Sequence, residues 1–503
     1  MVRPVVRDQD RIETCPGVTP CVARSLPTVF DLASPPYLRH SWVMIHISPA
    51  TAIIYRRIFK ISMPLVISLG ATTIMEFTDR LFLARYSLDA IAAALPAGIM
   101  ALLAMTIFLG TTSYVSVFVA QYTGQGRPEM VGRAVWQGIY VALLGAAVLG
   151  ALAFLAEDIF ALGGHSKEIQ VLESIYFKTL CLGAGIHLAG GAFAGFFTGL
   201  GRTRVVMLAN SAGMLLNIPL DYCLINGVGP FPELGILGAG LATVISWGLI
   251  TAILWIAMRR SENARFRLAT DRRLRPELWL RLMRYGLPSG MEFFLDIFAF
   301  TVFIFVVGRL GTMELAATNI ALNINALAFM PLVGFAMGTS TLVGQAMGAG
   351  KPDDVPMVVR ASLVLTFAYL AAMSAVFLFA PEAVLHLFQP RDMDPAAFAS
   401  VVGMGRILLM IVVAYLFFDG ISFIVYGALK GAGDTVFVMT SRLALVFLVM
   451  IAPLLAGAWL GFGLYYFWAV SCTFLIMLSL VGWWRFRQGK WRNMLVVEKS
   501  PPA

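Results

Sequence analysis

The chain has 503 residues, of which 59% are hydrophobic and only 13% are charged, with a net charge of +9. A soluble globular protein carries about 25% charged residues, so this composition excludes an ordinary cytosolic enzyme, a disordered chain and a secreted disulfide-stabilised domain. The positive charge does not indicate nucleic-acid binding, because the basic residues lie between apolar segments and not on a polar domain.

Twelve apolar segments of membrane-spanning length follow one another along the chain. A bilayer core about 30 Å thick is crossed by roughly 20 apolar residues in a helix. The centres of the twelve segments lie near Ala71, Met105, Leu144, Leu188, Leu215, Ile245, Phe298, Leu327, Ala368, Val413, Val446 and Phe474. The sequence therefore predicts an all-α integral membrane protein with twelve transmembrane helices.

The loops between these segments are short and leave no room for a separate soluble domain. We expect five parts: a polar N-terminal tail (1–50), an N-lobe of helices 1–6 (51–258), a linker (259–284), a C-lobe of helices 7–12 (285–486) and a C-terminal tail (487–503). The first part contains Pro and Arg but no apolar run of signal-peptide length. An alternative is that the natural protein starts at Met44 or Met63.

Basic residues set the expected orientation. With both termini in the cytoplasm, 30 of the 37 Lys and Arg residues fall on the cytoplasmic side, nine of them in the linker. This bias follows the positive-inside rule. It predicts a multi-pass protein of the cytoplasmic membrane with both termini and the linker in the cytoplasm; the alternative for the linker is a site for anionic lipids.

The two halves of the chain are related by an internal repeat. At an offset of 224 residues, Pro64–Pro128 aligns with Pro288–Pro352 without a gap, and 14 of 65 positions are identical. The shared positions include the pattern Gln-x-x-Gly-x-Gly-x-Pro that begins at Gln121 and at Gln345. A glycine-rich pattern at 195–203 also matches 427–435 at an offset of 232. Six spans repeated in one direction predict two lobes related by a pseudo-two-fold axis along the membrane normal.

The glycine patterns themselves are expected to be tight turns at cytoplasmic helix ends. A phosphate-binding loop would require a preceding strand and a following Lys-Ser or Lys-Thr pair, and the sequence has neither.

Acidic residues inside the spans are the candidate functional groups. A carboxylate at the bilayer centre costs about 2.5–3.5 kcal/mol on insertion scales. Six acids lie in spans: Glu76, Asp79, Asp221, Glu292, Asp296 and Asp419. Some could pair with Arg80 or Arg406, but we expect too few basic residues at this depth to neutralise them all. An uncompensated carboxylate holds a proton or binds a cation.

Asn217 and Asp221 are spaced i,i+4 with Pro219 between them. Their side chains therefore share one helix face, and the proline frees a backbone carbonyl that can help to hold a cation or proton.

Several motifs resemble the MATE (multidrug and toxic compound extrusion) transporters, and most closely their NorM-type branch. The motifs are Thr78-Asp79-Arg80 with Arg85 and Asp89, Asn217–Tyr222, Gly238–Thr243, Gly286–Pro288 with Asp296, and Asp419 with Gly427–Thr435. The resemblance covers roughly residues 52–487. It implies export of amphipathic, often cationic, compounds driven by inward Na⁺ or H⁺.

The resemblance also implies site residues. Asp79, Asn217, Asp221 and Thr243 match a cation or proton site of the N-lobe, and Asp296 and Asp419 match acids of the C-lobe; Glu76 and Glu292 are accessory candidates. Two positions depart from the family pattern. Asp296 stands where Glu is usual, and Asp221 stands where NorM-type members often have Asn. The coupling ion, Na⁺ or H⁺, therefore stays open.

The function predicted is a cation-coupled antiporter that exports drugs by alternating access, working as a monomer without a cofactor, structural metal or nucleic-acid partner. One alternative is a lipid-linked sugar flippase, which tends to have a basic cavity and extra spans. A membrane-embedded enzyme is disfavoured because the five histidines are dispersed and the five cysteines lack metal-ligand spacing. A channel is distinguished only by ion-gradient-dependent counterflow.

Overall fold

The computed structural model describes residues 49–268, 270–388 and 395–498, and these residues contain helices and no strand. The N-terminal tail expected over 1–50 lies outside the described residues except for Pro49 and Ala50, which begin the first helix. Residues 499–503 of the expected C-terminal tail lie outside them as well.

The first half of the chain, here called the N-lobe, contains the first six spans. Its helices are α1 (Pro49–Tyr86), α2 (Leu88–Ser113), α3 (Val115–Gly124), α4 (Pro128–Ala153), α5 (Ala156–Ala161), α6 (Lys167–Gly199), α7 (Thr203–Asn226) and α8 (Ile236–Met258). Helices α2 and α3 follow one another and together form the second span. A 3₁₀ helix, η1 (Ser261–Phe266), lies in the linker.

The second half, the C-lobe, contains the other six spans. Its elements are α9 (Pro276–Gly308), α10 (Thr312–Gly348), the 3₁₀ helix η2 (Pro352–Asp354), α11 (Val355–Phe379), α12 (Pro381–His386), α13 (Pro395–Ala432), α14 (Thr435–Leu445), the π-helix η3 (Val446–Ile451), α15 (Ala452–Leu460), α16 (Leu464–Gln488) and the 3₁₀ helix η4 (Lys490–Asn493). Helix α9 begins inside the segment expected to be linker.

The predicted span pattern is confirmed, since every predicted centre lies in a helical segment. Among the described residues, eleven helical segments are long and apolar enough to cross a membrane. Helix α7 is the twelfth. Its 24 residues are long enough, but Arg204, Asn210, Asn217 and Asp221 make it more polar than the others. The least apolar span is therefore the one that carries two of the expected site residues.

Local sequence explains several helix ends. The hydroxyl groups of Ser87 and Ser166 cap α2 and α6 by accepting a hydrogen bond from the backbone three residues on. Prolines begin α4 and α9, where their missing N–H would have no partner. Gly227 and Gly461 end α7 and α15 in the left-handed conformation, which glycine adopts without strain.

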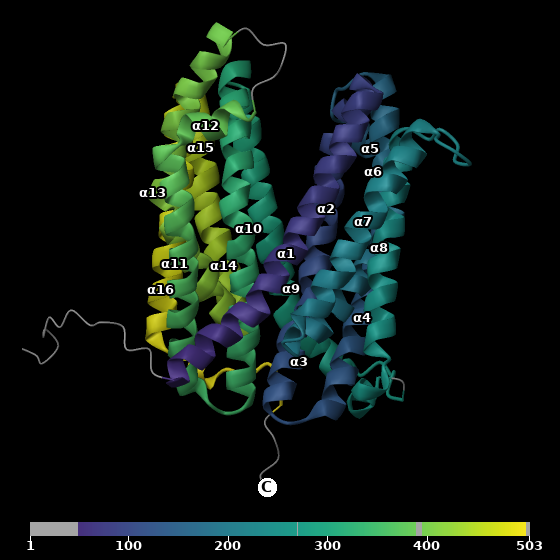
Figure 1. Ribbon diagram of the computed structural model, residues 1–503, viewed down its shortest axis with the longest axis vertical. Coiled ribbons are helices and arrows are strands. Elements are labelled where there is room, and N and C mark those ends of the chain that lie inside the picture. The colour runs from purple at the N-terminus through teal and green to yellow at the C-terminus, as the bar shows by residue number, and fades with distance from the viewer. Residues whose placement is uncertain (1–48, 269, 389–394, 499–503) are drawn as a thin grey trace, which may run out of the picture. The chain divides into compact units, whose positions relative to one another are not determined.

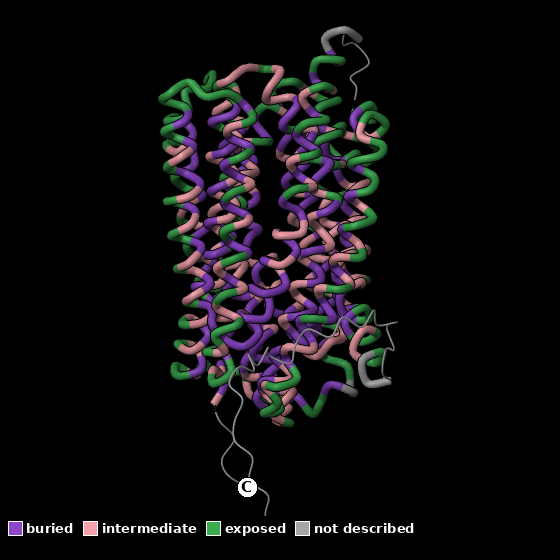
Figure 2. Tube along the Cα trace, turned by 90° about the vertical axis from the view of Figure 1, so that its left-hand side faces the viewer, coloured by how far each residue is buried: buried purple, intermediate pink, exposed green. Residues whose placement is uncertain are grey.

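The outer faces of the helices are apolar and exposed, as expected where a bilayer replaces water. Examples are Phe154 on the N-lobe and Phe379 and Trp459 on the C-lobe. Figure 2 shows exposed residues along the outer helix faces and buried residues along the faces that pack together. Exposing such apolar faces to water would be unfavourable. In a bilayer they contact lipid tails, which are as apolar as the faces themselves.

The first helix of each lobe begins by packing against the opposite lobe. Ile58, Ile61 and Leu65 of α1 belong to the apolar cluster of the C-lobe, and Leu278 and Leu282 of α9 belong to an apolar cluster of the N-lobe. In the same reciprocal way, α1 packs on α10 while α2 packs on α9. Figure 1 shows α1 running obliquely from the C-lobe into the N-lobe. This reciprocity matches the predicted pseudo-two-fold relation.

Candidate functional site: a buried carboxylate pair in the N-lobe

Asp79 of α1 is the centre of a buried polar cluster. Its side chain is 5% exposed, and its Oδ2 accepts a hydrogen bond of 2.9 Å from the hydroxyl group of Thr243 on α8. Asn217 and Asp221, both on α7 and fully buried, lie beside it. The structure thus brings together all four residues expected in the N-lobe site, from three different helices.

The cluster contains oxygen atoms that have no hydrogen-bond partner among the described residues. They are Asp79 Oδ1, both carboxylate oxygens of Asp221, and Asn217 Oδ1. No Lys, Arg or His of the described residues forms an ion pair with either carboxylate. Two adjacent buried carboxylates cannot both stay charged without compensation. The arrangement therefore suits a proton shared between the two acids, or a hard cation bound by carboxylate, amide and hydroxyl oxygens.

The accessory candidate Glu76 does not join this cluster. It is one turn before Asp79 on α1, but its side chain is exposed whereas that of Asp79 is buried. Among the described residues, no group of three or more His, Cys, Asp or Glu side chains is placed to hold a metal ion. A cation in the N-lobe would therefore depend on neutral oxygen donors as well as on the two aspartates.

The acids of α9 in the C-lobe are paired with basic residues. Arg442 of α14 forms an ion pair with Asp296 and lies 3.5 Å from a carboxylate oxygen of Glu292. Lys430 of α13 donates to the other oxygen of Glu292 at 2.9 Å. These two acids are therefore compensated, by Arg442 and Lys430 and not by the expected Arg80 or Arg406, whereas Asp79 and Asp221 have no ion pair among the described residues.

Asp419 of α13 is the remaining C-lobe candidate. It is 4% exposed, and its nearest polar partner is the Ser422 hydroxyl, 3.5 Å from Oδ1. It lies near Asp296 and Arg442 without forming an ion pair. Of the three candidate acids of this lobe, Asp419 is therefore the one that has no ion pair among the described residues.

Sequence reasoning missed Lys430 and Arg442 as partners of the acids of α9. The orientation count assigned both of them to a cytoplasmic loop, whereas they lie in α13 and α14. A signal was available. Arg442 lies in a segment, Thr435–Leu460, that contains no acidic residue, and a buried arginine needs a negative partner from another helix.

The glycine patterns of the two repeats meet at the end of the bundles that carries the linker and the C-terminal tail, here called the linker end. They lie at helix ends, since α3 ends at Gly124 and α10 ends at Gly348. Each glycine packs on the backbone of the opposite lobe. A Cβ atom on Gly124 would lie 2.2 Å from the carbonyl oxygen of Gln345, and one on Gly348 would lie 2.0 Å from that of Gln121.

The two glutamines of these patterns also bond across the lobes. Gln121 Nε2 donates to the carbonyl oxygen of Gly431 at 3.0 Å, and Gln345 Nε2 donates to that of Gly199 at 2.9 Å. Gly199 and Gly431 are themselves equivalent in the repeat. Two equivalent pairs of contacts therefore close the lobes against each other at the linker end.

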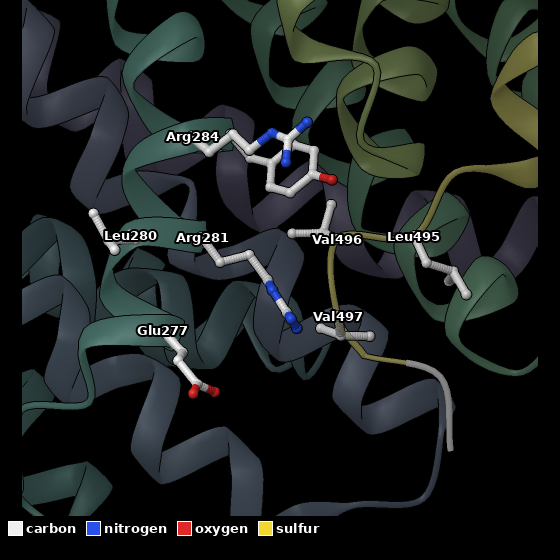
Figure 3. Close-up of a pocket in the computed structure, with 8 residues that line it drawn as sticks. Glu277, Leu280, Arg281, Arg284, Leu495, Val496 and Val497 are labelled. Atoms are coloured by element: carbon white, nitrogen blue, oxygen red, sulfur yellow. The ribbon is translucent and has the colours of Figure 1, made fainter. Parts of the chain in front are cut away.

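A segment of the C-terminal tail, Leu495–Glu498, crosses from the C-lobe to this junction. The backbone N–H groups of Val496 and Val497 donate to Gln121 Oε1. Their side chains are 1% and 4% exposed and join the apolar cluster of the N-lobe. Figure 3 shows them beside Arg281 and Arg284 of α9, around a cavity of about 400 Å³.

Glu498 fastens the end of this segment. Arg281 and the Tyr122 hydroxyl donate to its carboxylate, and Gln125 Nε2 donates to its backbone carbonyl oxygen at 2.8 Å. Partial burial raises the pKa of Glu498, but a backbone hydrogen bond, the Tyr122 hydroxyl and the guanidinium groups of Arg281 and Arg127 outweigh it, so that the pKa is lower than usual for Glu.

Two homologous six-span lobes, closed against each other at one end and containing buried carboxylates, define the class of this protein as a polytopic membrane transporter. Comparison with known proteins agrees. The MatE family model matches residues 64–223 and 288–454, once in each lobe. The two matches begin at Pro64 and Pro288, the same residues that begin the internal repeat.

Named relatives support the same assignment. The chain is 31% identical over 404 residues to a probable multidrug resistance protein NorM of Pseudomonas putida, which covers 77% of this chain and 84% of the relative. It is 25% identical over 462 residues to a protein of the same name from Thermotoga maritima, covering 89% and 95%. The chain therefore belongs to the MatE family, whose members are transporters and not enzymes.

Solved structures share the fold at lower identity. A eukaryotic MATE transporter superposes with a TM-score of 0.79 at 17% identity, covering 88% of this chain and 97% of that one. A mutant of a Vibrio cholerae MATE transporter superposes with a TM-score of 0.78 at 16% identity, covering 88% and 98%.

Proposed function

We propose that the protein is a cation-coupled antiporter that exports amphipathic or cationic drugs and toxic organic compounds across the cytoplasmic membrane by alternating access. The observation that carries the proposal is the buried pair Asp79 and Asp221, which has no basic partner among the described residues. A pair of this kind is unstable unless it takes up a proton or a small cation. An ion gradient is the source of that ion.

Asp79 and Asp221 supply the negative charge of the coupling site, and Asn217 and Thr243 supply neutral oxygens. Thr243 holds one oxygen of Asp79, which fixes the orientation of the carboxylate. Na⁺ and H⁺ both suit this donor set, since Na⁺ is coordinated by oxygen and H⁺ is shared by two carboxylates.

Substrate and ion are coupled through the N-lobe. When the ion binds from the outside, the affinity of the transporter for its substrate falls. The substrate is then released to the outside. By linkage, substrate binding weakens ion binding by the same factor. The names of the relatives, which are multidrug resistance proteins, support drugs as substrates. Asp419, an unpaired acid of the C-lobe, is suited to attract a cationic substrate.

Alternating access requires the lobes to separate at the end where they now meet. The reciprocal contacts of Gln121 and Gln345 are short, few and equivalent in the two repeats. They are suited to break together as one lobe rocks against the other. The bias of basic residues supports placing this linker end in the cytoplasm, together with both termini. Each chain contains a complete coupling site, which supports function as a monomer.

A drug-sensitive cell assay tests the N-lobe assignment. Asp79→Asn and Asp221→Asn each remove a charge with little change in volume, and each is expected to abolish active efflux of a fluorescent cation at normal membrane abundance. Asp158→Asn, in the exposed first turn of α5, is the matched control and should keep wild-type efflux. Normal efflux by both site variants would refute the assignment.

A further inference from the structure

Four charged side chains of the C-lobe form a closed set of ion pairs. Arg442 engages both oxygens of Asp296 through Nη1 and one oxygen of Glu292 through Nη2, and Lys430 engages the other oxygen of Glu292. All four carboxylate oxygens therefore have a cationic partner. In the N-lobe, by contrast, no carboxylate oxygen of Asp79 or Asp221 has a cationic partner among the described residues, and three of the four have no hydrogen-bond partner at all.

The internal repeat provides a comparison within the same chain. At the repeat offsets, every N-lobe equivalent of these charged residues is neutral: Ser68 for Glu292, Thr72 for Asp296, Thr198 for Lys430 and Asn210 for Arg442. The neutral residues make an equivalent contact, because Asn210 Nδ2 donates to Ser68 Oγ at 2.7 Å. A neutral pair thus suffices to pack these helices, and packing alone does not account for the charges of the C-lobe.

The reverse comparison shows that the coupling site is not duplicated. The C-lobe equivalent of Asp79 is Phe303, which is buried at 1% exposure. The acids of the two lobes therefore occupy different, non-equivalent positions. Among the described residues, Asp79 and Asp221 of the N-lobe have no ion pair, whereas Glu292 and Asp296 of the C-lobe are paired with Lys430 and Arg442. Asp419 of the C-lobe has no ion pair.

Arg442 is suited to act as a permanent cation. The residue is 5% exposed, and its guanidinium lies 5.3 Å from the ring centre of Tyr426 and contacts both acids. An arginine side chain stays protonated in proteins at any physiological pH. Two acids and two bases balance to zero charge, so this cluster does not require an added ion.

We propose that Arg442, with Lys430, fills the Glu292–Asp296 site of the C-lobe as a tethered cation, so that the coupling ion binds in the N-lobe alone and the unpaired Asp419 is left to attract the cationic substrate. Arg442 is then a residue that determines ion specificity and stoichiometry by excluding Na⁺ and H⁺ from Glu292 and Asp296. The inference rests on the proposed function, because it assumes that the N-lobe pair takes the coupling ion. The proposal also gives Asp296 the Arg442 guanidinium as its partner in place of the coupling ion.

The first test counts ions on the purified wild-type chain in detergent. We expect one site in total, read as one bound ²²Na⁺ per chain if Na⁺ is the coupling ion, or as one titrating proton that Asp79→Asn/Asp221→Asn removes if H⁺ is. In Asp79→Asn/Asp221→Asn we expect none. Two ions on the wild-type chain, or one ion left in the double variant, would overturn the proposal.

The second test opens the C-lobe site on purpose. In the Asp79→Asn/Asp221→Asn background, Arg442→Met removes the charge and keeps a long side chain, and leaves Asp296 without a cation. We expect this variant to gain one ²²Na⁺ or one titrating proton, and to lose it again when Asp296→Asn is added. The matched control Arg442→Lys should gain nothing. A monodisperse Arg442→Met variant that gains neither ion would contradict the proposal.

The two proposals fail in different ways. If the N-lobe assignment is wrong, Asp79→Asn and Asp221→Asn leave ion binding and efflux intact. If only the C-lobe inference is wrong, those variants lose one ion and keep another. If Arg442→Met does not fold, the number of ions bound by the wild-type chain still tests whether the C-lobe acids bind an ion.

Discussion

Gln121 and Gln345 lie 224 residues apart, and each donates its side-chain amide to a glycine carbonyl oxygen of the opposite lobe. The two acceptors, Gly431 and Gly199, are equivalent in the repeat. The repeat therefore produces both halves of one junction. A sequence feature expected to form only turns also joins the lobes.

Removing both amides should open this junction. A buried hydrogen bond contributes about 0.5–1.5 kcal/mol, so Gln121→Ala/Gln345→Ala should shift the equilibrium toward the state open at the linker end. We expect faster labelling of a cysteine at Ala120, a buried position at the junction, by a membrane-impermeant maleimide. In the proposed orientation, inside-out vesicles expose the linker end to the reagent.

Gln137→Ala is the control for this experiment. Gln137 is fully buried, but its partners are Arg133, Arg273 and Arg275, so its bonds do not join the lobes. It should leave the labelling rate unchanged. Equal rates in the double variant and in the wild-type chain would show that the glutamine pair does not hold the junction closed.

Adding a methyl group at the junction should be harmful. In Gly348→Ala the new Cβ would lie 2.0 Å from the backbone oxygen of Gln121, so the lobes must shift apart. Overpacking of this kind costs about 1–3 kcal/mol, and we expect a lower midpoint of thermal unfolding in detergent. Gly150→Ala, in a helix with no atom near the new Cβ, should be neutral or slightly stabilising. Equal midpoints for the two variants would contradict the close approach.

The tail segment Leu495–Glu498 should stay attached throughout the pH range in which coupling operates. Because the pKa of Glu498 is lowered below its ordinary value of about 4.3, its contribution is fully present above that value and is lost only as pH falls through the lower, folded pKa. Hydrogen–deuterium exchange of the Val496 and Val497 amides, corrected for intrinsic rates, should therefore show equal protection at pH 6 and pH 8.

Glu498→Gln should weaken this attachment by removing the charge that Arg281 and Tyr122 contact. Hydrogen bonds to charged groups contribute about 1.5–3 kcal/mol, and partial exposure reduces this, so we expect protection to fall by roughly tenfold. Protection that changes between pH 6 and pH 8 in the wild-type chain would mean that another titrating group controls the segment.

Thr243 should tune ion affinity without supplying charge. In Thr243→Val the hydrogen bond to Asp79 is lost and one neutral oxygen is removed. We expect the ion concentration for half-maximal efflux to rise about five- to tenfold, in line with a loss of about 1 kcal/mol, while Thr243→Ser stays near wild type. Ser246→Ala removes a buried hydroxyl of α8 that bonds only within its helix, and should have little effect. A similar change in Ser246→Ala would indicate a general effect on α8.

The fold was largely predictable because a membrane permits few alternatives. Apolar segments of sufficient length must form helices there, and the predicted centres are correct even for α7, which is unusually polar. The spacing of Asn217 and Asp221 on one helix likewise followed from local geometry. Their proximity to Asp79 and Thr243 depends on how three helices pack, and it came from family resemblance and not from the pattern of residues.

The C-lobe cluster could not be predicted in the same way. Lys430 and Asp296 are well separated in sequence, and a count of charges per loop placed the lysine outside the membrane. Helix α13 continues to Ala432, so Lys430 lies within it and can reach Glu292. The position of the end of α13, a few residues later than the charge count assumed, therefore places Lys430 within reach of Glu292.

Transport by the purified chain in proteoliposomes measures the coupling of drug export to an ion gradient. A fluorescent cation is loaded, and a Na⁺ gradient or a pH gradient is imposed separately on vesicles with the wild-type chain or with Asp221→Asn. We expect uphill movement of the dye with one of the gradients in wild-type vesicles, and only passive leakage with Asp221→Asn. Uphill movement with neither gradient, or undiminished uphill movement with Asp221→Asn, would contradict it.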